Sequence, residues 1–188
     1  DQQLVNVLET THQRGVQIRA LIDPDFAYRS YSEALDMMGV TFAKDCKVEV
    51  NNRPWRNPIS TVGVPQLLKG DLLHHKFGAI DGQIVITGSH NWSLAADRNN
   101  DEALLVIQSP TVAAHFKREF ERLYGNSVLG VPEWLQRKIK AQQQQCPQLN
   151  QAVTLTPNPS PIEGEGSNKE IGGKVNLNTA SQAELEQL

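Results

Sequence analysis

The stretch from residue 72 to residue 93, LLHHKFGAIDGQIVITGSHNWS, decides the fold class and the chemistry of this chain. Its signature positions follow a fixed spacing: His74, Lys76, Asp81, Gly88, Ser89 and Asn91. A chance match at all of these positions has a frequency of about 10⁻⁸ per starting point. Residues 72–80 are predicted to form a strand, in which residues two apart share a face. His74 and Lys76 therefore project together, and an imidazole beside an ammonium group suits a phosphate.

The remainder of the block is predicted to build the facing wall of a phosphate site. The dipeptide at 81–82, Asp-Gly, is typical of a two-residue hairpin, after which residues 83–87 return antiparallel. The polar turn at 88–91 offers an anion its backbone N–H groups, the Ser89 hydroxyl and the Asn91 amide. These donors have no acidic metal cage around them. The pattern indicates phosphoryl chemistry without a metal or another cofactor.

The block resembles the HKD motif of the phospholipase D superfamily, whose signature positions are all present. The resemblance implies that His74 attacks phosphorus to form a phosphohistidine, that a second HKD histidine protonates the leaving alkoxide, and that water then releases the phosphate. It also implies that Lys76, Ser89 and Asn91 hold the phosphoryl oxygens. Asp81 completes the catalytic set, and we expect it to brace the motif. Neutral imidazole is a suitable nucleophile, and the charge on the phosphoryl oxygens needs preorganised donors.

A segment after the motif offers two candidates for orienting the nucleophile. In the superfamily an Asn-x-Glu-Asn-like segment follows, and its glutamate hydrogen-bonds the nucleophilic histidine. Residues 99–103 read NNDEA and precede an apolar strand predicted at 104–107. Alignment on that strand gives the orienting role to Asp101, whereas a shift of one residue gives it to Glu102. Both carboxylates remain candidates.

Other residues have less specific interpretations. His75 faces the opposite side of the predicted strand from His74, which favours a packing role over chemistry. His90 occupies the variable position of the polar turn and is a candidate for lining the mouth of the site. Arg53 and Arg56, with Trp55 between them, are a candidate polyanion-binding patch, and a solvated Pro-rich loop is the alternative.

Length and composition limit the function classes. A chain of 188 residues is expected to hold one globular domain with appendages. Its formal net charge of −3 gives no global basic signature, so polyanion binding has to come from local patches. Cys46 and Cys146 lie far apart without metal-binding spacing, which predicts reduced thiols. The sequence contains no apolar run long enough for a transmembrane helix. A cytoplasmic location is the default, with periplasmic or secreted locations as alternatives.

The order of apolar patterns predicts an α/β fold: a phospholipase D-like sandwich lobe with a mixed β-sheet flanked by helices. The expected elements are a helix ending near residue 14, strands at 16–22 and 46–50, short helices at 32–38 and 92–96, the motif hairpin, the strand at 104–107, and a helix from 109 to 125. The superfamily fold has a strand before the first of these helices, so we expect the chain to begin inside a domain.

The C-terminal third is predicted to be appended to the lobe. The end of the chain, VNLNTASQAELEQL, contains a capping box formed by Ser181 and Glu184. It resembles the opening of a helix-hairpin-helix DNA-binding module of the competence-protein type, cut before its hairpin glycines. The expected divisions are an N-terminally incomplete HKD lobe at 1–130, a polar C-terminal helix at 131–150, a flexible Pro-, Gly- and Glu-rich linker at 151–173, and the truncated module at 174–188.

Together these features predict a metal-independent phosphodiesterase. The helix-hairpin-helix resemblance favours nucleic acid as substrate, and therefore an endonuclease. A phospholipase D or phosphatidyl transferase acting on phospholipid is the alternative, and an inactive single lobe that binds nucleic acid is a third. The chemistry needs two imidazoles, one neutral and one protonated, and one lobe supplies only one of them. A second HKD lobe is therefore expected, either in a homodimer or upstream in a longer chain.

Overall fold

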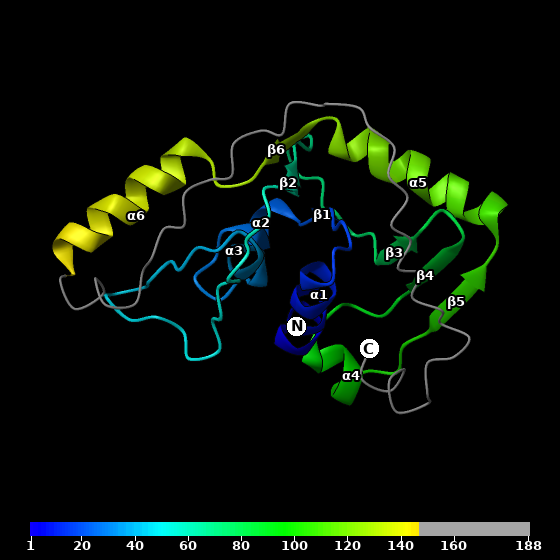
Figure 1. The fold of residues 1–188 in the computed structure, drawn as a ribbon, viewed down its shortest axis with the longest axis horizontal. Helices are drawn as coiled ribbons and strands as arrows, with labels where there is room; N and C mark the ends of the chain where they lie inside the picture. Colours follow the sequence, from blue (N-terminus) through cyan, green and yellow to red (C-terminus); the bar gives the residue numbers. More distant parts are fainter. Residues whose placement is uncertain (147–188) are drawn as a thin grey trace. The chain divides into compact units, whose positions relative to one another are not determined.

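The computed structural model describes residues 1–146 (Figure 1), so the predicted linker and helix-hairpin-helix opening lie outside the described residues. The helices are α1 (Gln2–Gln13), α2 (Pro24–Ala27), α3 (Glu33–Met37), α4 (Leu94–Asn99), α5 (Pro110–Tyr124) and α6 (Glu133–Gln145). The strands are β1 (Ala20–Leu21), β2 (Val62–Pro65), β3 (Phe77–Ile80), β4 (Ile84–Gly88), β5 (Leu104–Gln108) and β6 (Ser127–Leu129). The α/β class and the mixed sheet flanked by helices are confirmed.

The six strands form two small sheets. In the first, β1 pairs in parallel with β2, and β2 pairs antiparallel with β6. In the second, β3, β4 and β5 are consecutive antiparallel neighbours. Helix α5 contacts strands of both sheets and so forms a common support for them.

Capping residues set the ends of the helices as the sequence predicted. The Ser32 hydroxyl accepts a hydrogen bond from the Ala34 amide at 3.3 Å and caps α3. Helix α5 begins after Ser109, whose hydroxyl accepts a hydrogen bond from Val112, and it ends at Gly125. A capping side chain satisfies a backbone N–H that has no partner in the first turn, which is why these starts are readable from sequence.

The main core lies between α3, β2 and α6. Leu35, Val62, Leu135 and Ile139 are each at most 2% exposed within one cluster. Helix α6 is polar over most of its length, but Leu135 and Ile139 fall four residues apart on one face and join the core of the lobe. The sequence predicted this helix but not how firmly it is anchored.

The predicted strand at 46–50 and the predicted reduced thiols are both wrong. Residues 44–47 form an isolated bridge with a turn in which Asp45 and Cys46 have positive φ values of 51° and 58°. Cys46 forms a disulfide with Cys146, with 5.5 Å between their Cα atoms. The two cysteines are 100 residues apart in sequence, and only the docking of α6 brings them together. The strand predicted at 16–22 is also shorter than expected, since only β1 pairs.

Candidate functional site

The motif forms a hairpin whose first strand is shorter than predicted. Strand β3 begins at Phe77, which pairs with Thr87 of β4, and residues 71–76 precede it as irregular backbone. The predicted strand at 72–80 is therefore too long, and His74 and Lys76 lie outside the regular strand in which they were predicted to share a face. Both residues instead lie in the entry to β3.

Local hydrogen bonds order this entry segment. The Lys76 ammonium group donates to the backbone oxygen of His74 at 2.8 Å, and the Thr87 hydroxyl donates to the backbone oxygen of Lys76 at 3.2 Å. His74 is exposed, which leaves its imidazole accessible to a substrate. The ammonium group is thus held beside the nucleophile candidate through the backbone, without a shared strand face.

The antiparallel register brings three polar segments to one edge of the second sheet, namely the edge at which β3 and β5 begin and β4 ends. His74 and Lys76 come before β3, the polar turn from Ser89 to Asn91 follows β4, and residues 99–103 come before β5. In neighbouring antiparallel strands, the start of one lies beside the end of the next. Entry into β3, exit from β4 and entry into β5 therefore lie at the same edge.

Asp81 lies at the opposite end of the hairpin. Ile80 pairs with Ile84, so the turn has three residues and not the two predicted from the Asp-Gly pair. Asp81 itself adopts a φ of 51°, a conformation that aspartate tolerates better than most residues. Strand β3 lies between Asp81 and Lys76, which are about 16 Å apart at roughly 3.3 Å per residue. Its place in the turn is compatible with a bracing role and puts it away from the other signature side chains.

Gly88 allows β4 and β5 to close tightly next to the site. A Cβ atom added at Gly88 would lie 1.9 Å from the backbone oxygen of Ala103. The Ser89 amide donates to that same oxygen at 3.0 Å. Only glycine permits this approach, which gives the motif glycine a structural reason that sequence spacing did not reveal.

The close approach places Glu102 against Ser89. The Ser89 hydroxyl donates to one carboxylate oxygen of Glu102 at 2.5 Å and accepts from the Ala103 amide at 3.0 Å, while Asn100 donates to the other carboxylate oxygen at 3.1 Å. The hydrogen bond from Ser89, followed by that from Asn100, lowers the pKa of Glu102, and the charges of His90 and Lys76 act in the same direction. Asp101 is exposed and makes no hydrogen bond within residues 1–146.

Two further polar residues flank this cluster. His90 lies 2.9 Å from the Asp97 carboxylate, measured from its Nε2 atom, and its side chain is 19% exposed. Asn91 is exposed, and its backbone oxygen accepts from the Ser93 amide at 2.7 Å. The short helix after the turn begins at Leu94 and not at Trp92, because Ser93 caps it. The pairing of His90 with Asp97 was not predicted.

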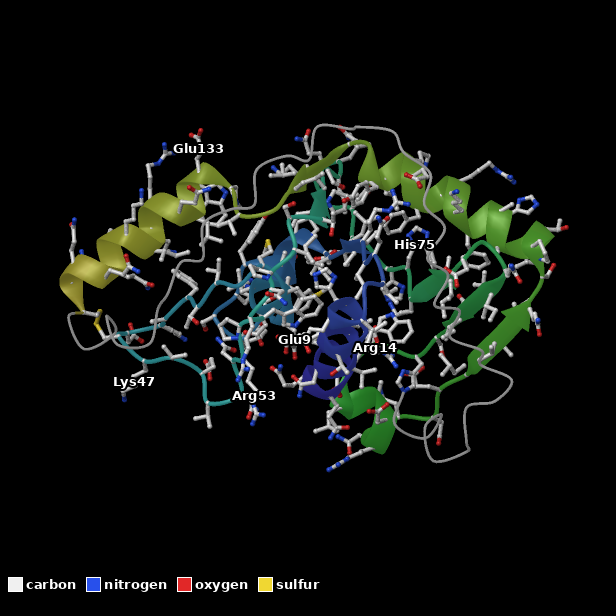
Figure 2. All side chains as sticks on the ribbon, in the orientation of Figure 1. Glu9, Arg14, Lys47, Arg53, His75 and Glu133 are labelled. Atoms are coloured by element: carbon white, nitrogen blue, oxygen red, sulfur yellow. A yellow bond between two sulfur atoms is a disulfide. The ribbon has the colours of Figure 1, made fainter. Side chains whose placement is uncertain are left out.

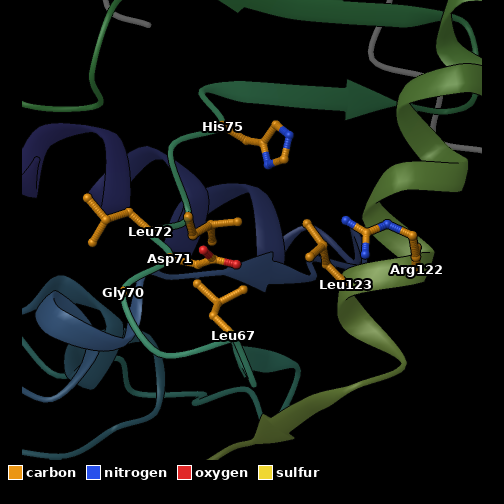
Figure 3. Close-up of a pocket in the computed structure, with 8 residues that line it drawn as sticks. Leu67, Gly70, Asp71, Leu72, His75, Arg122 and Leu123 are labelled. Atoms are coloured by element: carbon orange, nitrogen blue, oxygen red, sulfur yellow. The ribbon is translucent and has the colours of Figure 1, made fainter.

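His75 faces away from the cluster, toward α5. Its ring packs edge-on against Phe77 at 5.9 Å between centroids, and its Nε2 atom lies 3.8 Å from Glu119. It also lines a cavity of about 410 Å³ with leucine side chains and Arg122 (Figures 2 and 3). The His75 side chain is 49% exposed, so the packing role expected for it is limited to the side that faces α5.

The loop that holds the candidate polyanion-binding patch of Arg53 and Arg56 buries the aromatic residue between them. Trp55 is 2% exposed and belongs to the main core. Arg53 and Arg56 remain exposed on either side of it (Figure 2 labels Arg53). Trp55 is therefore neither part of an exposed patch nor solvated, and only the two arginines are available to a polyanion.

Two absences among the described residues concern metal binding and membranes. Within residues 1–146, no group of three or more His, Cys, Asp or Glu side chains is arranged to hold a metal ion. Among the helices of the same region, none has the length and apolar composition needed to cross a membrane.

The sequence matches a family model described as "Cardiolipin synthase, PLD-like domain" over residues 1–124. Among curated proteins, it is 29% identical to the mitochondrial cardiolipin hydrolase of Xenopus tropicalis over 115 residues, covering 60% of this chain and 44% of the relative. The corresponding human protein is 29% identical over 122 residues, covering 65% of this chain and 40% of the relative. A phospholipase D of Rickettsia typhi is 27% identical over 129 residues, covering 68% of this chain and 53% of the relative.

The chain therefore spans less than half the length of these cardiolipin hydrolases. Among solved structures, it is similar to NucT from Helicobacter pylori with a TM-score of 0.53 and 19% sequence identity, covering 67% of this chain and 73% of the other. At that identity, the likeness concerns the fold alone.

Proposed function

This chain belongs to the phospholipase D-like family that the matched domain model describes, and from that membership we propose that it is a metal-independent phosphodiesterase. One observation carries the proposal. The antiparallel register gathers the exposed His74, the Lys76 ammonium group and the polar turn with Ser89 at a single sheet edge. A nucleophile, a fixed cation and neutral donors at one place are what phosphoryl transfer without a metal requires.

The proposed reaction has two steps that conserve atoms and charge. The lone pair of a His74 ring nitrogen forms an N–P bond while the P–O bond to the leaving alkoxide breaks. A second, protonated histidine gives its proton to that alkoxide. Water then attacks the phosphohistidine, the N–P bond breaks, and the phosphomonoester leaves as the second histidine takes a proton back.

The remaining residues have supporting roles in this proposal. Lys76 and Asn91 hold phosphoryl oxygens, and Asp81 braces the hairpin from its far end. Ser89 has one hydroxyl hydrogen, and in the structure it donates that hydrogen to the Glu102 carboxylate. The hydroxyl therefore has to rotate toward the phosphate when substrate binds. We assign the orientation of His74 to Glu102 and not to Asp101, because the Glu102 carboxylate lies against the motif.

The second histidine comes from a second HKD lobe. The chain holds one HKD motif, and the two steps need two imidazoles in different protonation states. A second copy of this chain is one source, and a lobe elsewhere in a longer parent protein is the other. Sedimentation of the purified chain distinguishes them, because activity that rises with the dimer fraction supports the homodimer.

For the substrate we propose nucleic acid, cleaved internally, on the strength of the helix-hairpin-helix resemblance at 174–188. A phospholipid is the second candidate, and two observations favour it. The relatives are named as cardiolipin hydrolases and a phospholipase D. In addition, Leu68 and Leu72 are 80% and 63% exposed in the loop that leads to His74, where they are free to meet an apolar substrate. An inactive lobe that only binds nucleic acid is the third outcome.

The test combines substrate and metal dependence. Purified full-length protein is incubated with plasmid DNA, single-stranded DNA, RNA and phosphatidylglycerol or cardiolipin vesicles, each with and without EDTA. Cleavage of nucleic acid in EDTA supports the proposal. Lipid turnover without nucleic-acid cleavage reverses the order of the two candidates, and loss of all activity in EDTA contradicts the metal-free mechanism.

Paired histidine variants identify the nucleophile. His74→Ala is expected to abolish turnover and the phosphoenzyme trapped by rapid quenching under alkaline conditions, which preserve phosphohistidine. His75→Ala is the matched control, because the neighbouring imidazole packs toward α5 and not toward the cluster. It is expected to lower stability while leaving phosphoenzyme formation in place. The reverse pattern would show that the assignment of the two histidines is wrong.

A further inference from the structure

The segment just before His74 is held from outside the motif hairpin by one carboxylate. The Leu73 amide donates to the Oδ2 atom of Asp23 at 2.7 Å. Leu73 is the residue immediately before His74 but lies 50 positions away from Asp23 in sequence. Since residues 71–76 precede β3 as irregular backbone, this bond replaces the strand pairing that would otherwise fix the position of His74.

Asp23 is itself firmly anchored. It follows β1, whose last residues pair with β2, and the Ile22 amide donates to the backbone oxygen of Gly63 at 3.0 Å. Its other carboxylate oxygen, Oδ1, accepts from the Asp25 amide at 2.9 Å as the N-cap of α2. Each oxygen thus accepts one backbone N–H group, and such bonds to an ionised acceptor are stronger than neutral ones. The carboxylate ties the end of the first sheet to the entry of the second.

We propose that Asp23 is a positioning residue for the His74 nucleophile, an inference that rests on the proposed phosphodiesterase function. Its ionised carboxylate fixes the Leu73 amide, and through it the backbone of His74, relative to the Lys76 ammonium group. In-line attack on phosphorus depends on such placement, and a shift of about 1 Å costs roughly 100-fold in rate. Asp23 acts through the backbone and does not touch the substrate.

The experiment compares three variants of the full chain. Asp23→Ala removes both acceptors, and Asp23→Asn keeps one oxygen for the Leu73 amide. Asp25→Ala is the matched control, because only its backbone amide takes part in the cap. Turnover of bis(p-nitrophenyl) phosphate gives kcat and KM, hydrogen exchange reports on the Leu73 amide, and NMR follows the ring signals of His74 with the exposed His115 as reference. Thermal unfolding verifies that each variant is folded.

For Asp23→Ala we expect kcat to fall about 100-fold with KM nearly unchanged, faster exchange at Leu73, and a shift of the His74 ring signals alone. Asp23→Asn is expected to fall between this variant and the wild type, while Asp25→Ala behaves as wild type. An Asp23→Ala protein with wild-type kcat, or with His74 signals that stay in place, would overturn the proposal.

The failure of the proposed function is separately visible. Wild-type protein that turns over no phosphodiester although it holds a second HKD lobe, as a homodimer or within a longer parent protein, refutes that function. The positioning proposal is then decided by the His74 ring signals alone, because they report the placement of the imidazole without turnover. Signals that move in Asp23→Ala but stay fixed in Asp25→Ala support it, and signals that stay fixed in both reject it.

Discussion

Breaking the Cys46–Cys146 disulfide is expected to destabilise the lobe strongly. The bond closes a loop of about 100 residues, for which the chain-entropy relation gives about 4.7 kcal/mol of stabilisation through the unfolded state. For a protein of this size, 1 kcal/mol corresponds to a change in Tm of about 2–4 °C, so reduction is expected to lower Tm by roughly 10–20 °C. The effect is global, because residues 47–145, about two thirds of the described residues, lie between the two cysteines.

The same perturbation is expected to leave α6 docked in the folded state. Leu135 and Ile139 are buried in the main core, and the Gln142 side chain donates to the backbone oxygen of Ala43 at 2.6 Å. Removal of the disulfide therefore acts mainly on the free energy of unfolding and not on the native arrangement. Hydrogen exchange of α6 amides in the reduced protein measures this distinction.

The assay follows thermal and urea unfolding with and without a reducing agent. Cys146→Ser is expected to show the low Tm under both conditions, and titration of free thiols confirms the redox state of each sample. Oxidised protein with two free thiols, or a wild-type Tm that is unchanged on reduction, would refute this reasoning. Disulfides persist in oxidising compartments, so a confirmed cross-link favours the periplasmic or secreted alternative over the cytoplasmic default.

Three further changes test the local physics. Gly88→Ala is expected to cost about 1–3 kcal/mol in urea unfolding, because its Cβ meets a facing backbone carbonyl, whereas Gly78→Ala has open space and serves as the control. Burial raises the pKa of Asp36 from 3.8 to about 6, so the proton is held more tightly in the folded state and stability falls as pH rises through that range. Asp36→Asn is expected to remove this fall and to recover up to about 3 kcal/mol at neutral pH, as measured by urea unfolding across pH. Ser89→Ala is expected to raise the pKa of Glu102 toward its usual value in a carboxyl NMR titration, and an unchanged pKa would contradict the hydrogen bond assigned as its main cause.

Sequence predicted the elements whose signals are local. The capped start of α3 at Ser32, the Ser109-Pro110 start of α5 and the apolar strand β5 all appear where expected. In each case a few adjacent residues carry the information, as a side chain that satisfies backbone donors or as a continuous apolar run. Prediction failed where a distant partner decides the outcome. The disulfide forms only because α6 docks on the lobe, and the Trp55 side chain is buried in the core although its neighbours in the loop are polar.

The candidate site shows the same division within a single motif. Alternation along one strand was the wrong reason to expect His74 beside Lys76, since both residues precede β3. Their proximity to Ser89 instead follows from the antiparallel order of β3, β4 and β5, which places alternate strand ends at one sheet edge. That order is insensitive to a shift of a few residues in strand bounds, and it also sends Asp81 to the opposite edge. The exact position of His74 then depends on contacts that sequence spacing does not reveal, above all the long-range hydrogen bond from the Leu73 amide to Asp23.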